Sequence, residues 1–155
     1  MKIRLICVGT KMPDWVSTGY EDYQKRLTGS IQLELIEIPL NKRSKGADIQ
    51  RLIQKEGGQM LTAIPPRYRT ICLDVQGKSL GTEQLAAKLE RYEQQGDSIA
   101  LLVGGPEGLS AECLARAEDK WSLSALTLPH PLVRIVLAEQ IYRSWSLLTG
   151  HPYHR

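Results

Sequence analysis

The chain has 155 residues, of which 42% are hydrophobic and 24% charged, and its formal net charge is +3. This length and composition are typical of one globular domain that buries about 70% of the surface of its unfolded chain. No apolar run approaches the roughly 20 residues that a membrane-spanning helix requires, which argues against such a helix.

The first segment and the cysteines indicate the compartment. Residues 1–9 carry charge within an apolar stretch and lack a small-residue cleavage site, so they are interpreted as a first strand and not as a signal peptide. Cys7, Cys72 and Cys113 are odd in number and widely spaced, which favours free core thiols over a disulfide framework or a zinc knuckle. We therefore expect a protein of a reducing compartment, the cytoplasm.

Four runs have the pattern of strands: 3–8, 33–38, 70–75 and 98–103. The last two are almost continuously apolar, as in strands of a parallel sheet that helices cover on both faces. Helical periodicity fills the intervals, with a first helix from Pro13 to Leu27 and a second over 49–60. Thr82 is predicted to cap a third helix and Ser110 a short fourth one. This alternation predicts one α/β domain.

The final helix is predicted to begin at Pro131 and to end before Gly150. Its first half, residues 132–138, is apolar on almost every side, and a helix of this kind is buried on more than one face. In a chain this small, burial of two faces predicts a partner surface. The simplest partner is a second copy of the chain, in a homodimer.

Basic residues gather in the segment 41–46, which contains Lys42, Arg43 and Lys45, and Lys25-Arg26 and Arg67/Arg69 add to the same sign. One interpretation is a solvated surface loop. The other is contact with nucleic-acid phosphates, whose charge Lys and Arg neutralise without reading a base.

A glycine turn, G-G-P-E-G at 104–108, follows the fourth predicted strand. Its spacing matches neither the dinucleotide fingerprint G-x-G-x-x-G nor the phosphate-binding P-loop. What remains is a glycine turn at the carboxyl end of a buried strand, where open α/β sheets bind ligands. A plain tight turn is the alternative.

Three strings in fixed order identify a family: G-G-P-E-G, then W-S-L-S-A-L-T-L-P-H-P-L-V-R from Trp121, then the terminal H-P-Y-H-R. Together with V-G-T-K-M-P-D-W from Val8, they resemble the SPOUT-class methyltransferases that modify N3 of a pseudouridine in bacterial 23S ribosomal RNA. The resemblance implies S-adenosylmethionine as cofactor and the ribosome as RNA partner, without a metal. It also implies an α/β fold with a C-terminal trefoil knot at about 70–155, and pairing of two subunits through that knot.

By the same resemblance, the cofactor contacts are Leu73, Gly104, Gly105, Leu123, Ser124, Ala125, Leu126, Thr127 and Leu128. The loop 123–128 has no ionisable side chain. An adenine there is therefore expected to be recognised by backbone groups and apolar packing. For Leu73 alone, a core leucine is the alternative interpretation.

The reaction makes its main demand on the acceptor, because a uracil-type N3 carries a proton that must leave before or during methyl transfer. A positioned base or a cation that stabilises the resulting anion assists this step. The tail offers Tyr153, His154 and Arg155 as catalytic candidates, with His154 as base and Arg155 as cation or phosphate contact. The division of roles stays open, and a frayed terminus is the alternative. His151 and His154 have metal-ligand spacing but no further ligand nearby, so no metal site is predicted.

Four further residues complete the candidates. A structural role is expected for His130, which lies between two prolines, and also for Glu107, ahead of substrate orientation. Lys11 and Trp15 are candidates for RNA contact, although Trp15 fits equally well as a packed start of a helix.

Two rival functions are a non-catalytic RNA-binding factor of the ribosome and a transfer-RNA methyltransferase. The intact glycine turn and tail disfavour the first, and the lack of an appended RNA-binding domain disfavours the second.

Overall fold

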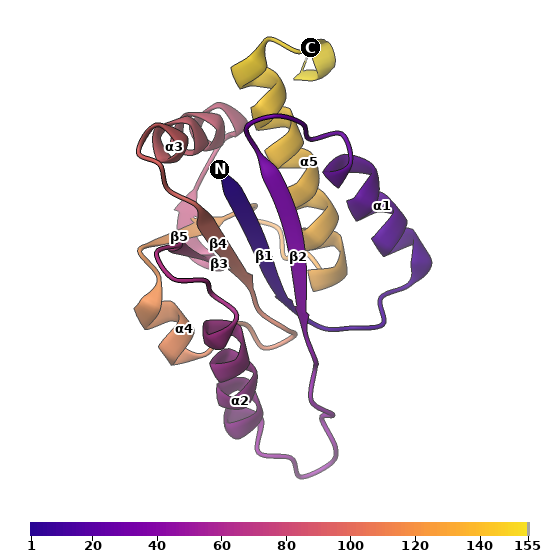
Figure 1. Ribbon diagram of the computed structural model, residues 1–155. Helices are drawn as coiled ribbons and strands as arrows, with labels where there is room; N and C mark the ends of the chain where they lie inside the picture. Colours follow the sequence, from indigo (N-terminus) through magenta and orange to yellow (C-terminus); the bar gives the residue numbers. More distant parts are fainter. Residues whose placement is uncertain (155) are drawn as a thin grey trace.

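The computed structural model describes residues 1–154, apart from the side chain of His154. Five parallel strands form one sheet in the order β2-β1-β4-β3-β5 (Figure 1). The strands are β1 (Lys2–Val8), β2 (Gln32–Ile38), β3 (Arg69–Ser79), β4 (Ile99–Val103) and β5 (Asp119–Ser122). The predicted parallel α/β architecture is confirmed.

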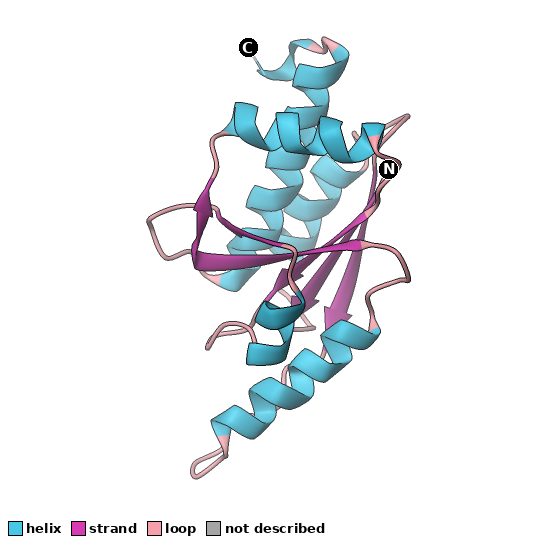
Figure 2. Cartoon of the chain, turned by 90° about the vertical axis from the view of Figure 1, so that its left-hand side faces the viewer, coloured by secondary structure: helices cyan, strands magenta, loops and turns pink. Residues whose placement is uncertain are grey.

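Helices cover both faces of the sheet, as Figure 2 shows. On one face, α1 (Asp14–Gln24) and α3 (Thr82–Gln94) both pack against α5 (His130–Thr149). On the other face, α2 (Ile49–Thr62) packs against α4 (Ala111–Arg116). A short 3₁₀ helix, η1 (Pro152–His154), follows α5. No helix of the described residues is long and apolar enough to cross a membrane.

The two faces of the sheet carry separate hydrophobic cores, because neighbouring residues of a strand point to opposite sides. Leu5 and Leu101 belong to the core beneath α1, α3 and α5, whereas Ile6 and Leu102 belong to the core beneath α2 and α4. All of β4 is buried. The prediction that apolar strands are covered on both faces is thus confirmed for β4.

All three cysteines are buried and free, as predicted. Cys7 lies in β1 and Cys72 in β3, and burial raises the pKa of each thiol to about 12. Both side chains therefore stay protonated at neutral pH and behave as small core hydrophobes.

One of the two predicted helix caps is confirmed by the structure. Ser110 caps α4 as predicted, because its hydroxyl accepts a hydrogen bond from the Cys113 N–H at 3.2 Å. The predicted Thr82 cap is wrong: Gly81 is the N-cap of α3. The Thr82 hydroxyl instead donates to Gln140 Oε1 at 2.8 Å and ties α3 to α5. A tertiary contact has replaced the local one.

The third strand is longer than the predicted run 70–75, because β3 pairs with β5 along an irregular ladder. The register shifts between Leu73 and Lys78, so residues 74–77 form a bulge in the ladder. A Cβ on Gly77 would lie 2.8 Å from the Lys120 carbonyl, so the close approach of the two strands requires glycine there. Beyond the bulge the pairing resumes, which extends β3 to Ser79.

Within one chain, α5 buries a single apolar face that includes Leu137 and Ala138. Leu132 remains 37% exposed, so the expected burial on more than one face is absent from the isolated chain. Arg134 is the exception in this apolar segment. Its buried guanidinium donates to Glu37 Oε2 at 2.6 Å and to the Gly9 carbonyl at 2.7 Å, which fixes α5 to the ends of β1 and β2. The dimer stays a prediction.

Candidate cofactor cavity and active site

A cavity of about 770 Å³ lies at the carboxyl ends of β4 and β5, beside the bulge in β3 and the start of α5. Its volume falls within the range of small-molecule sites. Among its lining residues are the cofactor candidates Leu73, Gly104, Gly105, Leu123, Ser124, Leu126, Thr127 and Leu128. Ala125 is exposed and does not line the cavity. The fold therefore brings three distant segments of the chain to one place.

The glycine turn is folded tightly on itself. The Gly108 N–H donates to the Gly105 carbonyl at 3.0 Å, and Gly108 has a φ of +85°. A Cβ on Gly104 would lie 2.5 Å from the Gly108 carbonyl carbon, and one on Gly105 would lie 3.2 Å from Val8 Cγ1. A valine at Gly104 would thus displace the turn itself, and a valine at Gly105 would press on Val8 of β1.

The loop from Ser122 to Leu128 is held by short-range hydrogen bonds. The Ser122 hydroxyl donates to the Ser124 carbonyl at 3.2 Å, and the Leu126 N–H donates to Ser124 Oγ at 3.0 Å. Leu126 remains 73% exposed and Val75, from the β3 bulge across the cavity, 70%. Two large apolar side chains left open on one cavity are expected where a ligand or partner covers them.

The sequence missed Asp74, Val75 and Gln76, which line the cavity beside Leu73. The bulge directs these residues away from the strand ladder. An isolated glycine within a strand often marks a bulge, but Gly77 lies just beyond the predicted strand 70–75 and therefore gave no such signal.

His130 was expected to be structural, yet it too lines the cavity. Its Nδ1 is buried without a hydrogen-bond partner among the described residues. Burial, and secondarily the charge of Arg134, hold the pKa of His130 below its ordinary value, so the imidazole is neutral at neutral pH. An orphaned polar atom beside a cavity fits a site that receives a polar ligand or water.

Glu107 belongs to an ion-pair network. The Arg43 guanidinium donates from Nε and Nη2 to the Glu107 carboxylate at 3.1 and 2.8 Å, and also to Glu56 on α2. Hydrogen bonding from Arg43 lowers the pKa of Glu107. The structural role expected of Glu107 agrees with this geometry.

Ion pairing divides the basic residues into two groups. Arg43 is engaged with Glu56 and Glu107, and Arg69 pairs with Asp97. Lys42 and Lys45 are exposed and make no ion pair with another described residue.

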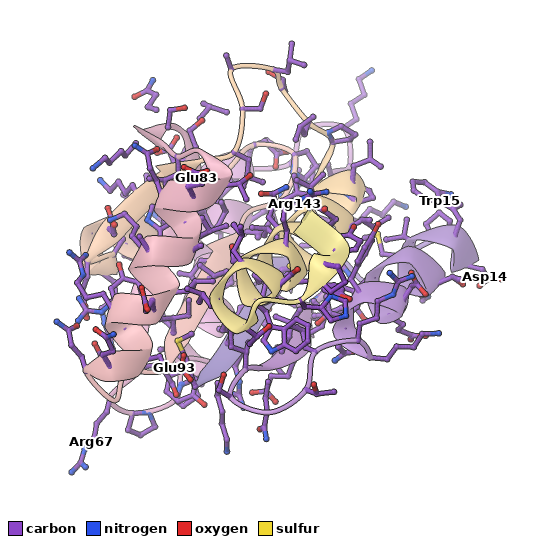
Figure 3. The ribbon with its side chains drawn as sticks, turned by 90° about the horizontal axis from the view of Figure 1, so that it is seen from above. Asp14, Trp15, Arg67, Glu83, Glu93 and Arg143 are labelled. Atoms are coloured by element: carbon purple, nitrogen blue, oxygen red, sulfur yellow. The ribbon has the colours of Figure 1, made fainter. Side chains whose placement is uncertain are left out.

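Figure 3 shows Trp15 projecting outward at the start of α1, where it is 57% exposed. Its position therefore favours a surface role over a packed helix start.

The tail folds back on the second half of α5. The Tyr153 ring stacks on Tyr142 with centroids 4.5 Å apart, and its hydroxyl donates to Glu139 Oε1 at 3.1 Å. Glu139 lies about 14 Å along the helix from His130. Within one chain, Tyr153 therefore does not reach the cavity. Arg155 and the side chain of His154 lie outside the described residues.

No group of three His, Cys, Asp or Glu side chains within residues 1–154 is placed to hold a metal ion. The lining of the cavity is instead largely apolar, with separate polar side chains such as Ser124, Thr127 and His130. This chemistry fits an organic ligand that combines an aromatic ring with a few polar groups, such as the adenosine portion of S-adenosylmethionine.

Comparison with solved structures gives the same fold at low sequence identity. A protein from Bordetella pertussis Tohama I, described as a probable methyltransferase, has a TM-score of 0.58 and 14% identity, with 92% of this chain and 95% of that chain covered. A protein from Haemophilus influenzae Rd KW20, described as a probable methylase family protein, has a TM-score of 0.57 and 12% identity, covering 97% and 67%.

Comparison with protein families and curated sequences identifies the relatives. A family model described as "Predicted SPOUT methyltransferase" matches residues 1–154. Ribosomal RNA large subunit methyltransferase H of Ectopseudomonas mendocina (strain ymp) is 57% identical over 155 residues, with 100% of both chains covered. The chain therefore belongs to the SPOUT methyltransferase family.

Proposed function

We propose that this protein is an S-adenosylmethionine-dependent methyltransferase that acts on N3 of a pseudouridine in 23S ribosomal RNA within the ribosome. The full-length identity of 57% to a ribosomal RNA large subunit methyltransferase carries this assignment. The cavity at the carboxyl edge of the sheet supports it, because open α/β sheets bind ligands at this edge.

The cofactor side of the reaction is assigned to the cavity. Leu73, the glycine turn and the loop 123–128 hold the adenosine portion by backbone contacts and apolar packing, which suits their chemistry. S-adenosylmethionine supplies an electrophilic methyl group whose leaving group departs neutral, so the protein needs no acid at the donor. In this proposal residues 70–155 form the trefoil knot of the family.

The acceptor side is assigned to the tail. A histidine such as His154 takes the N3 proton, and an arginine such as Arg155 stabilises the negative charge on the base or holds a phosphate. Tyr153 anchors the tail through its stacking on Tyr142.

A homodimer reconciles the two assignments. Tyr153 packs on the second half of α5, away from the cavity at the start of that helix, so the tail of one subunit serves the cavity of the other. The partly exposed Leu132 and the exposed Trp15 offer apolar surface for such pairing.

Transfer of labelled methyl from S-adenosylmethionine tests the proposed substrate directly. Intact ribosomes, protein-free ribosomal RNA and transfer RNA are compared in parallel, and the modified base is identified by mass spectrometry. We expect label at pseudouridine N3 in ribosomes only. Efficient labelling of free RNA would show that the assembled ribosome is not required, and no labelling of any RNA would reject the assignment as an RNA methyltransferase.

Thr127→Trp is expected to weaken S-adenosylmethionine binding at least about tenfold, because an exposed cavity-lining side chain is replaced by one large enough to fill the site. Calorimetry gives the affinity, and Thr62→Trp is the control, since Thr62 is also exposed but lies at the end of α2. Equal affinities in both variants would remove the cofactor from this cavity.

Lys42→Gln with Lys45→Gln is expected to weaken RNA binding and to reduce its salt slope by about one unit per lost phosphate contact. Arg43 is left unchanged because it is already ion-paired. The control removes the same charge from Lys2 and Arg67, which are exposed, make no ion pair with another described residue and lie at the amino ends of β1 and β3. If both pairs lower the slope alike, the loop acts only through net charge.

A further inference from the structure

The corner of the glycine turn is exposed at Pro106, Glu107 and Gly108, and one hydrogen bond, from the Gly108 N–H to the Gly105 carbonyl, closes it from within. The carboxylate of Glu107 connects this corner to the rest of the protein, because it accepts two hydrogen bonds from Arg43. Paired bonds between a guanidinium and a carboxylate are among the stronger and more directional polar contacts in proteins.

Arg43 is itself held by a second carboxylate, Glu56 of α2. Glu56 of α2 is only 3% exposed, and it accepts hydrogen bonds from Arg43 and from both the backbone and the side chain of Asn41. Burial disfavours the charged form of Glu56, but these hydrogen bonds outweigh it and lower the pKa of the carboxyl. The guanidinium is therefore held between two carboxylates that would otherwise repel each other.

The support behind the turn is closely packed. Gly57 follows Glu56 on α2, and a Cβ there would lie 2.2 Å from Ser110 Oγ, so α2 and the start of α4 are in close contact. Leu40, which precedes the basic segment, approaches Gly105 as well: a Cβ on that glycine would lie 3.4 Å from Leu40 Cδ1. The turn is thus backed on both sides, and Arg43 links its exposed corner to this support.

We propose that Arg43 is a positioning residue for the cofactor site: by holding Glu107 it fixes the glycine turn in the shape that the ligand requires. This inference rests on the proposed function for the identity of the ligand. It also ties the turn to the loop that carries Lys42 and Lys45, so one guanidinium connects the segments assigned to RNA and to cofactor.

Arg43→Met, which keeps an unbranched apolar stem but removes the guanidinium and its charge, is the main variant. We expect S-adenosylmethionine affinity, measured by calorimetry, to fall about tenfold, which corresponds to about 1.4 kcal/mol. Glu107→Gln leaves the pair of Arg43 with Glu56 in place and is expected to give a smaller loss. The double variant should bind no more weakly than Arg43→Met, because both changes break one link.

Arg69→Met is the matched control, because Arg69 also bridges two carboxylates, Asp97 and Glu118, but at the amino end of β3. Both arginine variants are expected to lower the melting temperature, and only Arg43→Met to lower the affinity. Fully additive losses in the double variant, or unchanged affinity in Arg43→Met and Glu107→Gln, would overturn the proposal.

Hydrogen exchange at the Gly108 amide gives a readout without cofactor. It is expected to be several-fold faster in Arg43→Met and Glu107→Gln than in the wild type and Arg69→Met. Unchanged Gly108 exchange in both turn variants would overturn the positioning role even if the enzyme methylates RNA. Faster exchange with no methyl transfer by the wild type would support it and reject the proposed function alone.

Discussion

Deletion of Tyr153 to Arg155 is expected to lower methyl transfer to ribosomes by about 10³-fold, within the range that positioned acid-base groups contribute. S-adenosylmethionine affinity should change by less than about twofold, since Tyr153 packs on Glu139 and Tyr142 and not on the cavity of its own chain, and the proposed role of the tail is on the acceptor side. Single-turnover rates and calorimetry measure the two quantities separately. Normal methylation by the truncated protein would show that the tail is only a chain end.

Two single substitutions separate the roles within the tail. Loss of a general base in His154→Ala should remove the decline of activity at low pH, whereas loss of a charge stabiliser in Arg155→Ala should lower activity at every pH. Tyr153→Phe is the control for the anchor, because it keeps the ring that stacks on Tyr142 and removes only the hydroxyl bonded to Glu139.

Mixing two impaired variants, at a cofactor concentration too low to occupy the Thr127→Trp cavity, is expected to restore activity if the site is shared between subunits. A heterodimer of the tail-deleted chain and Thr127→Trp has one site that combines an intact cavity with an intact tail. Random pairing of equal amounts makes about half of the dimers mixed, so about a quarter of the wild-type activity should return.

Unmixed dimers of each variant are the controls for this recovery. Equilibrium sedimentation of the mixture must show that subunits exchange, because a slowly exchanging dimer would hide the effect. With exchange established, no recovery would mean that each site is complete within one chain.

Helices and strands could be predicted from the sequence wherever the local residue pattern matches the burial that the folded protein imposes. The apolar runs around Cys72 and Leu101 predicted strands covered on both faces, and Gly150, with a φ of +73°, ends the last helix where its sequence position suggested. Strand β5 was missed because its sequence, Asp-Lys-Trp-Ser, has neither alternation nor an apolar run. It is a strand only because β3 offers it a pairing edge.

The candidate site shows the same limit. Leu73, Gly104 and the loop 123–128 came from a family resemblance, and the fold gathers them at one cavity with the exception of Ala125. Three neighbouring cations, Lys42, Arg43 and Lys45, looked alike in the sequence, yet only Arg43 meets Glu56 and Glu107. Which cation is paired depends on residues far along the chain, and no local pattern encodes that.

The order of the strands also governs how the chain can fold as it is synthesised. The amino end of β1 is joined to the amino end of β4 by a hydrogen bond from the Lys2 N–H to Ser98 Oγ, two residues 96 positions apart along the chain. Leu137 and Ile141 of α5 close the core above β1 and β4 later still. Because non-local pairings form only after long segments are available, β1 cannot be enclosed until β4 and α5 have been synthesised. We therefore expect the first strand of the chain to be among the last to be enclosed.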